Sequence, residues 1–141
     1  KNGKFELDLI NTHKKTIKMN QETKPIHSEC CKIPKGWGHE VIIINNDKYC
    51  SKLLVFKGGC KFSMHYHMIK EETWYVLLGE FLFTWIDTEQ GIKHTTKLST
   101  GEVVTIPIGM PHQLEAITDA TIVETSTKHY DSDSYRIYKG D

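Results

Sequence analysis

Residues 59–79 read GCKFSMHYHMIKEETWYVLLG, and this stretch decides how the rest of the chain can be interpreted. Glycines bound its apolar and aromatic residues, which is typical of two β-strands joined by a turn. Successive side chains of a strand point to opposite faces, so His65 and His67 project to the same side. If that side faces the protein interior, both rings need a partner, because an unpaired buried polar group is costly. A bound metal ion would satisfy both rings.

From Val41 onward the chain is rich in short strand-like segments. Nine segments of Val, Ile, Phe, Tyr, Trp and Thr alternate with Gly, Asn, Asp and Ser, from VIIIN at residues 41–45 to ATIVETS at residues 120–126. Strands at this spacing predict an antiparallel sandwich or barrel, and helical periodicity is nearly absent. The expected fold class is therefore all-β.

One domain is the expected organisation for a chain of 141 residues. We interpret residues 1–33, which are largely polar, as an N-terminal arm that could supply an edge strand or a strand swapped onto a neighbouring subunit. Within the arm, FELDLI at residues 5–10 alternates as a half-buried edge strand does. Residues 34–141 form the expected barrel, and the aromatic segment 135–138 is expected to pack back onto it.

Composition excludes several classes of partner. Eighteen Lys and Arg balance eighteen Asp and Glu, so the net charge gives no reason to expect nucleic acid or an anionic membrane surface. No apolar run approaches the roughly 20 residues of a membrane-spanning helix. A small-molecule partner is expected instead. The four cysteines include no C-x-x-C pair, so we interpret them as reduced thiols of a cytoplasmic protein.

Two later elements carry groups that can complete a site around the paired histidines. Glu71 and Glu72 open the next strand, where a carboxylate can turn back toward the imidazoles. The segment 101–116, GEVVTIPIGMPHQLEA, places His112 at the start of another strand after a rigid Pro and Gly turn. Three imidazoles and one carboxylate suit Zn, Fe, Mn, Ni or Co rather than Ca or Mg. The sequence therefore predicts one divalent transition metal.

Taken in order, these residues resemble the two motifs of the cupin superfamily, G-x5-H-x-H-x3,4-E-x6-G and G-x5-P-x-G-x2-H-x3-N. The matching residues are Gly59, His65, His67, Glu72 and Gly79 in the first motif and Gly101, Pro107, Gly109 and His112 in the second. The resemblance implies a double-stranded β-helix, or jelly-roll barrel, with metal ligands His65, His67, Glu72 and His112. Glu71 is the rival carboxylate, but only Glu72 has six residues before Gly79. Ala116 replaces the Asn of the motif, a position that is not a ligand in the family.

The flanking segments are similar to the C-terminal cupin domain of type II mannose-6-phosphate isomerases. Residues 34–59 resemble the start of that domain, and residues 122–137 resemble its end. The similarity implies a metal-dependent enzyme of the isomerase or epimerase type, acting on a sugar or sugar phosphate in carbohydrate metabolism. Two alternatives stay open, a non-heme Fe(II) dioxygenase and a non-catalytic sugar-binding or regulatory cupin. A homodimer, common in the superfamily, is also expected.

An aldose–ketose isomerisation needs a group that moves a proton between adjacent carbons. A divalent metal that polarises the carbonyl and neighbouring hydroxyl lowers the cost of the enediolate. The general base still has to come from the protein. Glu71, if it does not coordinate the metal, is the first candidate, and Gln113 and Glu115 are weaker ones.

The candidate substrate contacts are Arg136, Trp37 and Gln113. A phosphate on the sugar needs a cationic anchor, and Arg136 is the only arginine of the chain. Trp37 lies in a glycine-flanked loop, KGWGH, and is expected to cap the barrel mouth. The lysines that could replace Arg136 as anchor are Lys52, Lys61 and Lys128.

Overall fold

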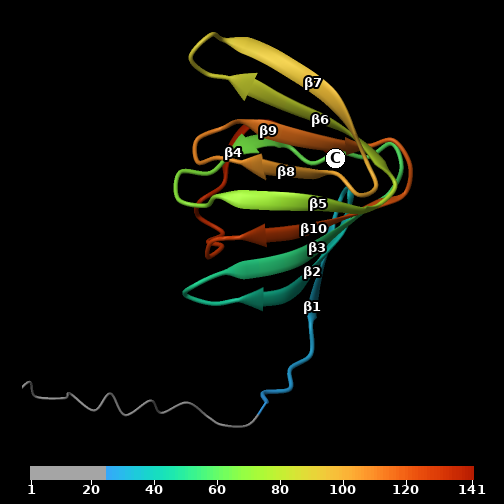
Figure 1. Ribbon diagram of the computed structural model, residues 1–141, viewed down its shortest axis with the longest axis vertical. Coiled ribbons are helices and arrows are strands. Elements are labelled where there is room, and N and C mark those ends of the chain that lie inside the picture. Colours follow the sequence, from blue (N-terminus) through green and yellow to red (C-terminus); the bar gives the residue numbers. More distant parts are fainter. Residues whose placement is uncertain (1–24) are drawn as a thin grey trace, which may run out of the picture.

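The computed structural model describes residues 25–141, which form two packed β-sheets (Figure 1). The strands in chain order are β1 (Cys31–Lys35), β2 (Gly38–Asn45), β3 (Cys50–Phe56), β4 (Met64–Tyr66), β5 (Glu72–Leu78), β6 (Glu80–Asp87), β7 (Ile92–Ser99), β8 (Val103–Ile106), β9 (His112–Ala116), β10 (Ala120–Ser126) and β11 (Tyr135–Tyr138). Within this described part of the chain, no helix has the length and hydrophobicity that crossing a membrane requires.

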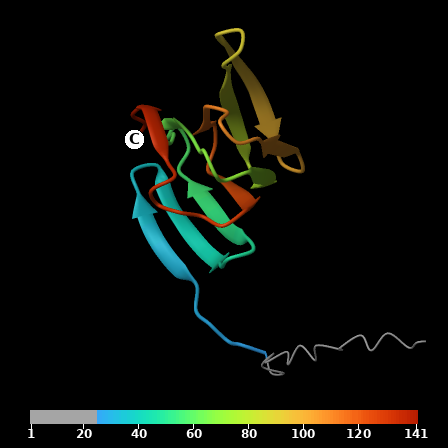
Figure 2. The same ribbon diagram turned by 90° about the vertical axis from the view of Figure 1, so that its left-hand side faces the viewer.

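The two sheets are built from strands that alternate along the chain. One sheet has the spatial order β1-β2-β3-β10-β5-β8, and the other has the order β11-β4-β9-β6-β7. All pairs are antiparallel, and from β3 onward the chain changes sheets after every strand except β6. The β1–β2 and β6–β7 hairpins lie at opposite ends of the molecule (Figures 1 and 2). This arrangement confirms the predicted all-β jelly-roll barrel.

The nine predicted strand segments correspond to β2 through β10, and the structure adds β1 and β11. Both additional strands are sheet edges with largely exposed side chains, so they lack the alternation that would reveal them in the sequence. Pro34 is tolerated in β1 because an edge strand need not donate every backbone hydrogen bond. Strand β1 crosses the predicted boundary at residues 33 and 34. The predicted edge strand at residues 5–10 lies outside the described residues.

Inward-facing residues of neighbouring strands line up by polarity, and this divides the interior into two halves. Lys52 of β3 lies opposite Glu124 of β10, whereas Leu54 and Val76 both lie opposite Ile122. The apolar rows continue into a buried aromatic cluster, in which Trp37 stacks on Phe56 with ring centroids 4.3 Å apart. Burying each large apolar side chain contributes roughly 1.5–3 kcal/mol. The apolar half therefore holds the sheets together, and the polar half is left for a site.

Gly79 is the single residue between β5 and β6, where the chain changes sheets. Its φ of 82° lies in the left-handed region that favours glycine. An added Cβ would lie 2.6 Å from the Ala120 Cβ and 2.6 Å from the Asp119 carbonyl oxygen. This position therefore excludes a side chain for two reasons, backbone conformation and space.

We predict that Gly79→Ala lowers the free energy of unfolding by about 2–4 kcal/mol, since backbone strain and overpacking both contribute. Gly59→Ala is the matched control, because Gly59 has a φ of 81° but no atom within 4 Å of an added Cβ. The control should lose only about 1 kcal/mol. Urea denaturation measures both values, and equal losses would show that the crowding at Gly79 is not a constraint.

Candidate metal centre

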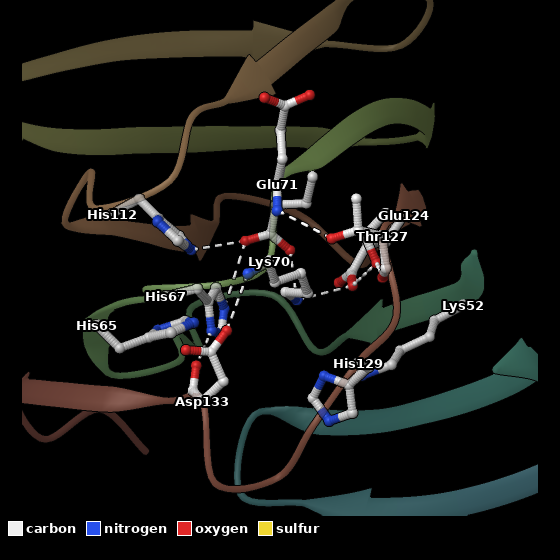
Figure 3. A network of polar contacts seen from close by, with 12 residues as sticks. Lys52, His65, His67, Lys70, Glu71, His112, Glu124, Thr127, His129 and Asp133 are labelled. Carbon is white, nitrogen blue, oxygen red and sulfur yellow. Dashed lines mark hydrogen bonds and ion pairs between the residues drawn. The ribbon is translucent and has the colours of Figure 1, made fainter. Parts of the chain in front are cut away.

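Four side chains from three strand regions meet in the polar half of the interior. His65 lies in β4, His67 directly follows β4, and His112 opens β9. Strands β4 and β9 pair with His65 opposite His112, so the register of the five-stranded sheet brings these two rings together. Glu72 opens β5 in the six-stranded sheet and faces them across the interior. Figure 3 shows the three imidazoles converging on one point.

The distances are short enough for one ion to contact all four groups. Ligand atoms of His65, His67 and His112 all lie within 4.8 Å of one another. Glu72 Oε1 lies 3.0 Å from His112 Nε2 and 3.6 Å from His67 Nε2. The structure thus brings together the four residues that the sequence nominated as ligands.

Backbone carbonyls fix the orientation of each ring. The Nδ1 atoms of His65 and His112 lie 2.7 Å and 2.8 Å from the carbonyl oxygens of Ser63 and Met110. His67 Nδ1 makes the same kind of contact with the Asp133 carbonyl. An Nδ1–H that donates to a carbonyl leaves Nε2 with a free lone pair, the arrangement usual for metal-binding histidines. All three rings are therefore set to present Nε2 to the centre.

The Asp133 side chain holds the loop that carries the site. Its carboxylate accepts hydrogen bonds from the backbone amides of Met68, Ile69 and Lys70 at 2.8–3.1 Å. Burial alone would raise the pKa of Asp133, but these amides lower it overall. Because the same residue binds His67 through its carbonyl, Asp133 positions both the ring and the turn between β4 and β5.

Burial keeps His65 and His67 neutral. It lowers the pKa of His65 to about 3, with a smaller effect from His112. It also lowers the pKa of His67 to about 4, helped by the Lys70 ammonium. Burial would raise the pKa of Glu72, but the Lys70 ammonium, 2.7 Å from Oε2, helps to hold it well below its usual range. At neutral pH His65 and His67 are therefore neutral imidazoles and Glu72 is a carboxylate, the protonation states that metal binding requires.

The centre fits a cation because lone pairs face one another. Nε2 of His67, Nε2 of His112 and Oε1 of Glu72 are buried and form no hydrogen bond with the described residues. With Nδ1 as the protonated nitrogen, Nε2 of His112 directs its lone pair at a carboxylate oxygen only 3.0 Å away. Each unsatisfied buried group costs roughly 1–3 kcal/mol. Three nitrogens and one oxygen suit a divalent transition ion, and His65, His67, Glu72 and His112 are the residues that would hold it.

The second oxygen of Glu72 belongs to a buried charge network that the sequence did not reveal. Lys70 Nζ lies 2.7 Å from Glu72 Oε2 and 3.0 Å from Glu124 Oε1, and all three side chains are at most 5% exposed. Burial alone would lower the pKa of Lys70, but the two carboxylates raise it above its usual value. Strand alternation could have placed Glu124 inside β10, but no local pattern pairs it with Lys70, 54 positions earlier.

A cavity of about 320 Å³ opens beside the ligands. Trp37 and Arg136, two of the predicted substrate contacts, line it. Arg136 lies opposite His65 in the pairing of β11 with β4, which explains why it reaches the same space. Trp37 is a buried wall residue stacked on Phe56, rather than an exposed cap.

Two predicted residues lie outside this cavity. The exposed Glu71 side chain points away from the imidazoles, because consecutive residues of an extended segment face opposite sides (Figure 3). The structure therefore does not bring Glu71, the predicted general base, together with the candidate ligands. Gln113 is buried, and its side-chain amide donates to the Phe62 carbonyl at 2.8 Å. Its amide nitrogen thus already has a hydrogen-bond partner within the protein. Glu115, the other weaker candidate for the general base, forms an ion pair with Lys61 at the surface.

We predict that the purified protein carries about one equivalent of a divalent transition metal. Removing a residue that only hydrogen-bonds to a metal ligand typically weakens metal affinity roughly 10- to 100-fold. His65→Ala should weaken it by more than this, because it removes a ligand itself. His27→Ala, at an exposed position outside the site, is the matched control and should keep its metal. Elemental analysis and chelator competition measure both. Equal metal content in His65→Ala and the wild type would contradict the assignment.

Solved structures with the same fold include members of two functional groups. A tryptophan-to-tyrosine variant of oxalate decarboxylase from Bacillus subtilis matches with a TM-score of 0.70 and 18% identity, covering 77% of this chain and 30% of that one. The capsular polysaccharide assembling protein CapF from Staphylococcus aureus matches with a TM-score of 0.70 and 21% identity, covering 79% of this chain and 32% of that one. At these identities the likeness shows the fold. The chain spans about a third of the length of either structure.

Sequence comparison identifies the family directly. No curated protein sequence matches the chain. The family model for the cupin domain matches residues 52–126, more than half of the chain. The matched region includes all four candidate ligands and both of the motifs that the sequence analysis quoted. The chain therefore belongs to the cupin family and is a metal-binding member of it.

Proposed function

We propose that this cupin is a metal-dependent enzyme of the isomerase or epimerase type that acts on a sugar or sugar phosphate. The observation that carries the proposal is that the ligands and a free arginine share one cavity. No carboxylate of the described residues lies within 4.0 Å of the Arg136 guanidinium, although this exposed residue lines the cavity beside His65. A volume of about 320 Å³ is at the small end of ligand sites. A sugar phosphate could reach the metal and the guanidinium together.

The names of the structural neighbours support parts of this proposal. One solved structure concerns the Mn(II) centres of Bacillus subtilis oxalate decarboxylase, so this fold can carry such an ion. CapF is named for its part in capsular polysaccharide assembly, which is carbohydrate chemistry. Because a fold hosts many activities, the case for a sugar depends on the site itself.

The bound metal would polarise a carbonyl and its neighbouring hydroxyl, lowering the cost of charge that develops on oxygen. The chain itself has to bind the substrate and move a proton between adjacent carbons. Glu40 and Glu124 line the cavity and replace Glu71 as candidates for the proton transfer. Arg136 would anchor the phosphate through paired N–H donors.

We predict that the metal-loaded protein interconverts an aldose phosphate and its ketose, with mannose 6-phosphate and fructose 6-phosphate as the first pair to test. Arg136→Gln should raise KM for phosphorylated sugars about tenfold, because it removes a charge-assisted hydrogen bond. It should leave kinetics with unphosphorylated sugars unchanged. A coupled assay for each direction measures these constants.

Lys139→Gln serves as control, because it removes an exposed cation from the same segment of the chain. If no sugar phosphate is converted with any of Zn, Fe, Mn, Ni or Co, the catalytic proposal is wrong. Oxygen consumption by the Fe(II) form would support a non-heme dioxygenase instead. Sugar binding without turnover would support a regulatory or carrier role.

We also propose that the protein is a cytoplasmic homodimer. All four cysteines are free thiols, which suits a reducing compartment. The outer face of the six-stranded sheet exposes paired apolar residues, with Tyr75 40% and Val103 61% exposed on neighbouring strands. A second copy would cover this patch.

Light scattering is expected to give twice the chain mass for the wild type. Val103→Glu should shift the mass toward that of a monomer, because it places a charge in the proposed interface. Glu89→Gln on the distant β6–β7 turn should not. A monomeric wild type would exclude this arrangement.

A further inference from the structure

The floor of the cavity carries a row of alternating charges that extends away from the metal. From the ligand Glu72 the row passes to Lys70 and Glu124, as described above. Lys52 follows, opposite Glu124 in the pairing of β10 with β3. Glu40 of β2 comes next, with its Oε2 3.7 Å from Lys52 Nζ. Metal binding and a phosphate anchor at Arg136 leave Lys52 without a role, and the proposed reaction uses Glu40 only as one of two candidates for the proton transfer.

Lys52 is buried without adequate partners. Its side chain is 3% exposed, and it lines the cavity. The contact with Glu40 is longer than a hydrogen bond, and Lys52 Nζ makes no hydrogen bond within the described part of the chain. An ammonium group has three N–H donors, and those of Lys52 are left without acceptors from the described residues at the cavity wall. A ligand in the cavity would supply the missing acceptors.

His129 supplies a complementary acceptor on the same wall. Its Nε2 lies 3.1 Å from Asp131 Oδ1, whereas its Nδ1 is buried without a hydrogen-bond partner among the described residues. Burial lowers the pKa of His129, and the charges of Lys52 and Lys70 lower it further. The neutral ring donates from Nε2 and keeps a lone pair on Nδ1. In Figure 3 the Lys52 side chain extends toward this ring.

The neighbours of Lys52 distinguish a hydroxyl ligand from an anionic one. An anion placed on Lys52 would also face the carboxylates of Glu40 and Glu124, which already offset the ammonium charge. A hydroxyl group both donates and accepts, so it can bond to Lys52 and to a carboxylate or His129 Nδ1 at once. Adjacent hydroxyls match the alternation of donors and acceptors along the row.

We propose that Lys52, Glu40 and His129 form a hydroxyl-binding subsite, which holds vicinal hydroxyls of a polyhydroxylated substrate while Arg136 binds its anionic group. The inference deepens the proposed function and rests on it for the class of substrate. It assigns the two cationic side chains to different parts of the same molecule. Specificity for hydroxyl groups then comes from the floor of the cavity, and specificity for phosphate comes from its mouth.

The test is binding, measured by calorimetry and by amide chemical shifts, with sorbitol, sorbitol 6-phosphate and inorganic phosphate as probes. Both the protein as purified and the chelator-treated protein are titrated, so turnover plays no part. Lys52→Met should weaken sorbitol and sorbitol 6-phosphate about tenfold and leave inorganic phosphate within twofold. Arg136→Gln should weaken inorganic phosphate and sorbitol 6-phosphate but not sorbitol. Lys57→Met removes an exposed lysine near the end of β3 and should change nothing.

Glu40→Gln is the second variant, because it keeps the side-chain size if Lys52→Met fails to fold. It should weaken sorbitol about fivefold and leave or improve phosphate binding, since one carboxylate is removed. Three results would each overturn the subsite: no polyol binding to the wild type, unchanged polyol binding in either variant, or an equal loss of inorganic phosphate in Lys52→Met. Absence of isomerase activity with these binding effects intact would refute the proposed reaction alone.

Discussion

The polar half of this protein depends on one electrostatic constraint, the meeting of lone pairs from opposite sheets. Imidazole nitrogens held by the five-stranded sheet face a carboxylate oxygen held by the six-stranded sheet, with 3.0 Å between Glu72 Oε1 and His112 Nε2. Without a cation these groups are buried and unsatisfied, so a metal held by them would also stabilise the contact between the two sheets. Metal binding and stability are therefore coupled, as expected where a site forms only in the folded chain.

The buried charge network of Lys70 and Glu124 limits Glu72 to one free oxygen, so its carboxylate would bind a metal through a single atom. Lys70 occupies Glu72 Oε2 at 2.7 Å, so only Oε1 faces the imidazoles. Buried ion pairs add little net stability, because desolvation offsets most of their attraction. The apolar half, with its stacked aromatic rings, has to supply that stability. The division of the interior thus separates residues that stabilise the fold from residues that bind.

The sequence predicted the features that depend on residues close together in the chain, such as the shared face of two histidines and the spacing of a motif. His65 and His67 share a face because strand periodicity is two, and the glycine spacing distinguishes Glu72 from Glu71. The same periodicity places Glu71 outside the cavity, which the functional interpretation of that residue overlooked. Edge strands β1 and β11 bury too little to leave an alternating pattern. Asp133 binds amides more than 60 positions away, and Lys70 meets Glu124 across 54 positions, so only the folded chain reveals these contacts.

Substrate selection in a shared fold has to come from residues around the metal rather than from the metal ligands. The fold that holds this centre also occurs in a decarboxylase of oxalate, a small dianion, and in a polysaccharide assembling protein. In this chain the cavity beside the ligands contains carboxylates as well as cations, including Glu40 and Glu124. Those carboxylates would repel a compact dianion but can accept hydrogen bonds from hydroxyl groups. The balance of charge on the cavity floor is therefore consistent with the polyhydroxylated substrate that we propose, whose single anionic group would remain near Arg136.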